Sequence, residues 1–183
     1  MAEREKPGKR LDEHSHAIAA LVGIGRRLDY RIWISREEQK RPWGNGTLGR
    51  LLTTAERCAS PAALFGGVQA ADVDVIWYDG RGTVWLFEVE WSAMLSQAVV
   101  GRRLPIDARR HLVVVDERVP LIQSKLHRGP WLRQCLEADG WEFIKLRHLL
   151  AYAERGETDR FGLASIVGLQ PPIEEAQGQL PLM

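Results

Sequence analysis

The stretch Val73–Glu90, VDVIWYDGRGTVWLFEVE, contains two runs of β-branched and aromatic residues separated by four residues typical of a turn. The turn residues are Asp79-Gly80-Arg81-Gly82, and the two runs predict strands at 73–78 and 83–90. Two β-rich runs on either side of a short, glycine-containing connection indicate a hairpin. We therefore expect an antiparallel hairpin at the centre of the fold.

Helices and strands are predicted on both sides of this hairpin. Apolar residues at spacings of three and four predict a helix over 16–28 with Ser15 as its N-cap, and alternation predicts a strand over 30–35. After the hairpin, the predicted order is a helix at 92–103, a strand at 111–115, a helix at 119–138 interrupted at Gly129-Pro130, a strand at 141–146 and a helix at 148–155. Residues 36–70 follow no clear pattern beyond a weak helix over 47–58. The order predicts an α/β domain built on a mixed sheet of about five strands flanked by helices.

Length and composition indicate one ordinary globular domain. The chain has 183 residues, of which 45% are hydrophobic, and 25 lysines and arginines against 24 aspartates and glutamates give a formal charge of +1. A chain of this length buries roughly 70% of its unfolded surface without disulfides or structural metals. We expect a flexible arm over 1–12, a single domain over 13–166 and a disordered tail over 167–183.

The same data exclude several classes of protein. Two cysteines, Cys58 and Cys135, give no disulfide framework and favour a reducing cytoplasm. The charged N-terminus lacks the apolar stretch of a secretory signal, and no run approaches the ~20 apolar residues of a membrane span. We expect a cytoplasmic protein with no membrane contact. A net charge near zero also excludes coating DNA by bulk charge, although it allows a local basic patch.

Three carboxylates interrupt the hydrophobic runs of the hairpin. Glu88 and Glu90 are two positions apart on one strand and share a face, while Phe87 and Val89 face the other way. Pairing across the turn brings Asp74 near them. Like charges this close need a cation or a proton, and oxygen ligands suit Mg²⁺. The alternative is that the acids are solvated or pair with arginines in a purely structural sheet.

At this point the sequence resembles a known family. D-V-I-W, then F-E-V-E-W-S, then an amphipathic helix with basic residues and the apolar strand L-V-V-V-D, is similar to the PD-(D/E)xK nuclease superfamily, especially its small restriction-endonuclease-like proteins. The resemblance covers roughly residues 13–150. It implies a three-layer restriction-endonuclease-like fold with the order α-β-β-β-α-β-α-β, and metal-dependent hydrolysis of DNA phosphodiesters, in repair or defence.

The resemblance also implies the members of a metal site. Asp74 matches the first metal-binding aspartate, Glu88 matches the acidic residue before x, and Glu90 stands where the family has lysine. This is the E-x-E form, in which Glu90 binds a second ion or accepts the proton of the attacking water. Glu13 completes the site from the leading helix. Mg²⁺ or Mn²⁺ is the expected cofactor.

Other residues are weaker candidates for the same site. His14 and His16 could replace Glu13, and no lysine follows in the next helix, where Gln97 is the polar residue to test. Loss of the lysine leaves open a second hypothesis: a catalytically inactive nuclease fold that binds DNA or a partner protein.

Basic residues and the chain end suggest partners. The candidate DNA-binding residues, chosen as pairs of arginines that could form a phosphate-facing rim, are Arg26, Arg27, Arg102, Arg103, Arg109 and Arg110. The alternative is that these are ordinary solvated arginines. Cleavage of both strands would suggest a homodimer. The residues Gln179, Leu180, Leu182 and Met183 resemble the Q-L-x-L-[F/M] peptide by which bacterial DNA-processing proteins bind the replication sliding clamp, although a short apolar chain end can arise by chance.

Overall fold

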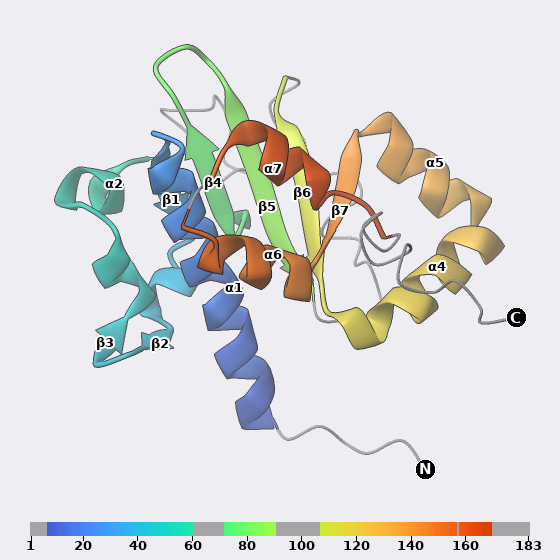
Figure 1. Cartoon of the computed structure of the whole chain (residues 1–183), viewed down its shortest axis with the longest axis horizontal. Helices are drawn as coiled ribbons and strands as arrows, with labels where there is room; N and C mark the ends of the chain where they lie inside the picture. Colours follow the sequence, from blue (N-terminus) through green and yellow to red (C-terminus); the bar gives the residue numbers. More distant parts are fainter. Residues whose placement is uncertain (1–6, 61–71, 91–106, 157, 170–183) are drawn as a thin grey trace, which may run out of the picture.

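A five-stranded mixed sheet forms the centre of the protein (Figure 1). The computed structural model describes residues 7–60, 72–90, 107–156 and 158–169. The strand order is β1-β4-β5-β6-β7, with bounds Arg31–Ile34, Val75–Tyr78, Val84–Glu90, Arg109–Val114 and Trp141–Lys145. β1, β4 and β5 are antiparallel neighbours, whereas β6 and β7 continue the sheet in parallel. The predicted hairpin is confirmed as β4–β5, and so is the α/β class with a mixed sheet.

Helices cover both faces of this sheet. α1 (Pro7–Arg27), α6 (Leu146–Glu154) and α7 (Arg160–Ser165) pack on one face around Trp77, Phe87 and Val113. α4 (Val119–Arg128) and α5 (Pro130–Ala138) pack on the other, against Leu86 and Leu112. Figure 1 shows α6 and α7 lying across the sheet and α4 and α5 beyond β7. The sheet is therefore buried on both sides, which explains its nearly continuous hydrophobic strands.

The break predicted in the second half of the chain is confirmed, whereas the predicted start of the leading helix is wrong. The helix predicted over 119–138 is interrupted where Gly129-Pro130 was expected to break it, between α4 and α5. The leading helix, however, begins at Pro7, inside the stretch expected to be an arm. Proline is favoured in the first turn of a helix and most residues that follow are good helix formers. Ser15 is consequently a buried residue within α1, so the prediction that it caps the helix is wrong.

The stretch with no clear pattern folds into several very short elements. They are the 3₁₀ turn η1 (Glu38–Lys40), the two-residue strands β2 (Pro42–Trp43) and β3 (Gly46–Thr47), the 3₁₀ turn η2 (Leu48–Leu51) and α2 (Thr54–Cys58). The weak helix predicted over 47–58 is therefore wrong for its first half. α2 begins late because Thr53 and Glu56 form a capping box, in which each side chain accepts the other's backbone N–H.

The end of the described chain departs from the prediction in a similar way. α7 was not predicted, and Asp159 caps it by accepting the backbone N–H of Gly162. Gly168, in the expected tail, bridges to Ile144 and donates to the carbonyl of Phe143 at 2.6 Å. The predicted helix at 92–103 and residues 170–183 lie outside the described residues. Within the described chain, none of the helices is both long and apolar enough to cross a membrane.

Candidate metal site at the end of β4

Asp74 lies immediately before β4, where the ladder with β5 ends. The last pair in this register is Val75 with Phe87. Beyond it, the Asp74 carboxylate takes the place of a backbone acceptor: its Oδ2 atom accepts the N–H of Val89 at 2.8 Å. Because Val89 lies between Glu88 and Glu90, this bond fixes Asp74 against the E-x-E segment of β5.

Two further polar residues reach the Asp74 carboxylate. His14 comes from α1 and Glu38 from η1, and both are buried. The Nε2 atom of His14 lies 3.0 Å from Oε2 of Glu38. One ligand atom each from His14, Glu38 and Asp74 lies within 4.8 Å of the other two. We call these three residues the triad.

The two carboxyl groups of the triad have pKa values shifted in opposite directions. The pKa of Asp74 is raised to about 6: burial and, to a smaller extent, the charge of Glu38 raise it, while His14 and the Val89 N–H act in the lowering direction. Burial alone would also raise the pKa of Glu38, but hydrogen bonds and charges from His14 and Arg41 lower it. Arg41 forms an ion pair with Glu38 three residues before it. Near neutral pH the triad thus combines a stabilised carboxylate with a carboxyl group that is costly to ionise.

The acids of β5 turn toward the other face of the sheet. Phe87 and Val89 belong to the core beneath α1, so the alternating residues Glu88 and Glu90 point away from α1, as predicted. Glu88 is 8% exposed and Glu90 is partly buried at the strand end. Neither is a member of the triad, and their roles in metal binding or catalysis stay predictions.

The leading helix contributes a different residue from the one favoured by sequence. Glu13 lines a groove between α1 and α6 together with His16, whose ring packs edge-on against Trp43 at 4.8 Å between centroids. His14, the weaker candidate, is the residue of α1 that belongs to the triad. One helical position separates residues by about 100° around the axis, so neighbours on α1 face different ways. Glu13 as a metal ligand stays a prediction.

Sequence reasoning missed Glu38. It lies in the stretch that showed no periodicity, in a 3₁₀ turn of three residues. Its only signal is the acidic pair Glu37-Glu38 shortly after a predicted strand, which by itself is typical of an exposed loop. Burial of Glu38 depends on contacts with α1 that are distant in sequence and therefore invisible to a local pattern.

The described arginines of the predicted DNA-binding set all have contacts within the protein. Arg26 pairs with Glu56 at 2.8 Å, and Arg27 donates to the carbonyl of Ala153 at 2.8 Å. The Arg109 guanidinium lies 4.8 Å from the centre of the Trp85 ring. Arg110 donates to the carbonyl of Asp139. DNA binding by these residues stays a prediction.

The remaining candidates fall outside the described residues: Gln97, Arg102, Arg103, Gln179, Leu180, Leu182 and Met183. Comparison of the chain with family models, curated proteins and solved structures finds no match. Two carboxylates and an imidazole within 4.8 Å are a donor set that can hold a divalent cation.

Proposed function

We propose that this chain is a metal-dependent phosphodiesterase that cleaves DNA, with Asp74 at the centre of its active site. The main support for the proposal is that the Asp74 carboxylate contacts two parts of the protein at once. It bonds to the β5 backbone between Glu88 and Glu90, and it lies within 4.8 Å of ligand atoms of His14 and Glu38. Acidic residues from separate elements thus converge on one strand end.

The residues of the site suit a divalent cation. Asp74 and Glu38 supply hard oxygen donors, which Mg²⁺ and Mn²⁺ prefer. Burial, with a smaller contribution from the charge of Glu38, makes ionised Asp74 unfavourable and raises its pKa to about 6; a bound cation would offset this cost. His14 adds a nitrogen donor, which Mn²⁺ accepts more readily than Mg²⁺ does. We therefore propose Mn²⁺ alongside Mg²⁺ as the cofactor.

The chemistry divides between the ion and the chain. A cation bound there would polarise the scissile phosphate and lower the pKa of a water molecule. In this proposal Asp74, Glu38 and His14 would together hold the cation, each through one ligand atom. Glu90, at the partly exposed end of β5, accepts the proton of the attacking water in place of the family lysine. Glu88, two positions before Glu90 and on the same face of β5, would be a further ligand of the cation, as the sequence suggests.

The architecture supports the restriction-endonuclease-like fold proposed from sequence. A leading helix is followed by three antiparallel strands and then by strands added in parallel to the third. The expected crossover helix between β5 and β6 falls on undescribed residues. A parallel neighbour requires such a crossover, and the 18 residues between Glu90 and Arg109 allow one.

Cleavage of labelled single-stranded, duplex, branched and mismatched DNA tests the proposal. Wild type, Asp74→Asn and Glu88→Gln are compared in Mg²⁺, in Mn²⁺ and in EDTA. We expect ion-dependent cleavage that both substitutions reduce at least about 100-fold, since metal-bound transition states are stabilised by several kcal/mol. Glu117→Gln, at an exposed carboxylate before α4, is the matched control and keeps full activity.

Absence of cleavage by wild type on every substrate in both ions would overturn the catalytic proposal. The inactive, DNA-binding alternative would then be preferred. One observation favours that alternative: Glu38 already forms an ion pair with Arg41, and the Nε2 atom of His14 lies 3.0 Å from its Oε2 atom. Binding of the C-terminal peptide to a sliding clamp, and assembly as a homodimer, are further proposals that the same protein preparations can test.

A further inference from the structure

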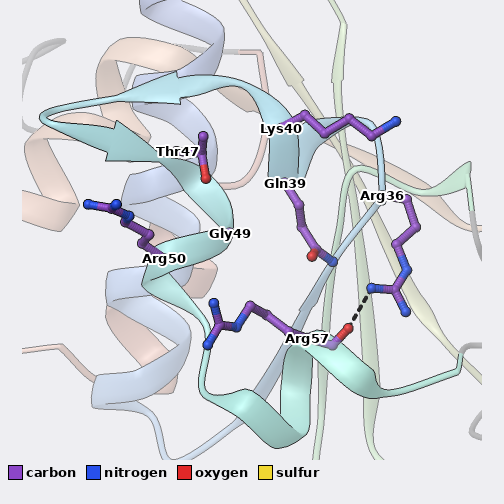
Figure 2. Close-up of a pocket in the computed structure, with 7 residues that line it drawn as sticks. All are labelled: Arg36, Gln39, Lys40, Thr47, Gly49, Arg50 and Arg57. Atoms are coloured by element: carbon purple, nitrogen blue, oxygen red, sulfur yellow. Dashed lines mark hydrogen bonds between the residues drawn. The ribbon is translucent and has the colours of Figure 1, made fainter.

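The short elements between β1 and α2 enclose a cleft of about 570 Å³ on the protein surface (Figure 2). Arg36, Gln39 and Lys40 line it from the segment around η1. Thr47, Gly49 and Arg50 line it from β3 and η2, and Arg57 lines it from α2. No aspartate or glutamate is among these residues. A chain whose formal charge is only +1 thus concentrates four cationic side chains around one cleft.

The charges of the cleft are largely uncompensated. Among the described residues, the guanidinium groups of Arg36, Arg50 and Arg57 take part in no ion pair. Arg36 donates to the backbone carbonyl of Arg57 at 2.5 Å, and Arg50 reaches the carbonyl of Asn45 only at 3.5 Å. Lys40 alone pairs with an acid, Glu37, and both side chains are exposed. Such a group of guanidinium donors suits phosphate oxygens.

The walls of the cleft are fixed relative to each other. A Cβ atom added at Gly49 would lie 3.0 Å from the carbonyl oxygen of Gln39, so η2 packs directly against η1. The Gln39 amide donates to the carbonyl of Ile34 at 2.8 Å, and Figure 2 shows its side chain between the two walls. The cleft is therefore a preformed feature of the fold, which limits the entropy lost when a ligand binds.

The cleft adjoins the triad through η1. Glu38 faces the triad, while its neighbours Gln39 and Lys40 line the cleft. A 3₁₀ turn rises only about 2 Å per residue, so the two sites share one short segment.

From these observations we infer that the cleft binds the phosphate backbone of a nucleic-acid strand. The inference rests on the proposed function in taking the ligand to be nucleic acid, but it does not require cleavage. It also differs from the prediction made from sequence, which assigned phosphate contacts to other arginines. The cleft residues were missed because they are scattered through the stretch that shows no periodicity.

Fluorescence anisotropy with labelled single-stranded and duplex oligonucleotides in EDTA tests the inference without cleavage. We expect Arg50→Gln/Arg57→Gln to weaken binding at least about tenfold and to lower the slope of log K against log salt by about 2 for duplex DNA, since each phosphate contact contributes roughly 0.9. Arg50→Lys/Arg57→Lys retains most of the affinity. Arg81→Gln/Arg155→Gln, which removes the same charge from the β4–β5 turn and the end of α6, changes affinity less than twofold.

Equal affinity of wild type and Arg50→Gln/Arg57→Gln, with equal melting temperatures, overturns the inference. Binding of inorganic phosphate or ADP without binding of any oligonucleotide overturns it as well, because the cleft then serves a small phosphate ligand. Cleft-dependent binding in a protein that cuts nothing supports the inference while the proposed nuclease function fails. Cleavage that is unaffected by the cleft substitutions gives the reverse result.

Discussion

Glu56 and Asp74 are both carboxylates largely removed from water, yet their pKa values move in opposite directions. Burial would raise the pKa of Glu56, but hydrogen bonds from Ile32 and Thr53 and the charge of Arg26 lower it overall. Asp74 accepts one backbone N–H and faces Glu38, and its pKa rises to about 6. A buried carboxylate that accepts several hydrogen bonds is already stabilised by them. One that accepts a single hydrogen bond can still gain stability from a cation.

The structural role of Glu56 is visible in its bonds. Oε1 accepts a hydrogen bond from the N–H of Ile32 on β1 at 2.9 Å. Oε2 accepts hydrogen bonds from the backbone N–H of Thr53 and from the Arg26 guanidinium, each at 2.8 Å. These contacts join α2 to the edge strand and to the end of α1. Both carboxylate oxygens of Glu56 are thus occupied by donors, whereas Asp74 and Glu38 offer ligand atoms within 4.8 Å of each other and of His14.

The largest effect is expected for Asp74→Asn, which should change both the pH dependence of stability and the response to Mn²⁺. Because the folded pKa lies above the usual 3.8, the contribution of Asp74 to stability is present below about pH 3.8 and is lost as the pH rises through about 6. At pH 8 without metal, the neutral variant should therefore be more stable than wild type, by up to about 3 kcal/mol. Saturating Mn²⁺ should raise the melting temperature of wild type by several degrees and leave the variant unchanged.

Differential scanning fluorimetry in EDTA and over a series of Mn²⁺ concentrations measures both effects. Asn keeps the acceptor for the N–H of Val89, so the fold is preserved. If Mn²⁺ stabilises Asp74→Asn as much as wild type, the ion binds elsewhere and the triad is not its site.

Glu56→Gln should show the opposite combination. An amide cannot satisfy three donors as a carboxylate does, so we expect a loss of about 2–3 kcal/mol and a melting temperature lower by roughly 5–10 °C. The Arg26 side chain is 39% exposed, so its ion pair contributes little of this. The rise in melting temperature caused by Mn²⁺ should persist. A variant that loses its metal response while keeping its stability would contradict the division between the two carboxylates.

These two regions also differ in what sequence could predict. The hairpin, its acids and their facing were predicted because alternation of apolar residues extends through β4 and β5, and strand geometry then fixes which side chains share a face. Glu38 and Glu56 lie among elements of two to five residues, for which no period can be recognised. Their burial is set by contacts with α1 and β1, and such long-range packing leaves no local pattern.

His111 extends the comparison to a buried base. Its ring lies beside those of Trp85 and Phe87 on the neighbouring strand, with centroids 5.2 Å from each, and burial together with the charge of Arg109 lowers its pKa to about 4. Glu142 lies 3.1 Å away but is mostly exposed, so it accepts a hydrogen bond from the neutral ring and does not hold it charged. Folding therefore favours neutral His111.

This contribution of His111 to stability is complete above about pH 6.5 and is lost as the pH falls through about 4. Between pH 7 and pH 5, wild type should lose about 2 kcal/mol more than His111→Gln, which keeps a donor for Glu142 but cannot titrate. Urea unfolding at the two pH values measures the difference. Parallel losses in both proteins would mean that protonated His111 finds a charge partner in the folded state.

The position of α1 against the sheet gives the smallest expected effect, and it determines where His14 lies. A Cβ atom added at Gly25 would approach the side chains of Ile32 and Trp77 to 2.5–2.8 Å, whereas one added at Gly23 meets nothing within 4 Å. Gly25→Ala should therefore cost about 1–2 kcal/mol through overpacking, and Gly23→Ala should stabilise the helix by up to about 1 kcal/mol. Urea unfolding of both variants provides the measurement, with each serving as the control for the other.

Because His14 reaches Glu38 from the same helix, displacement of α1 in Gly25→Ala should also weaken the response to Mn²⁺, and Gly23→Ala should leave it intact. A stabilising Gly25→Ala would show that α1 can move away from β1 and β4 without cost. The close packing at Gly25 would then not be what positions His14 beside Glu38.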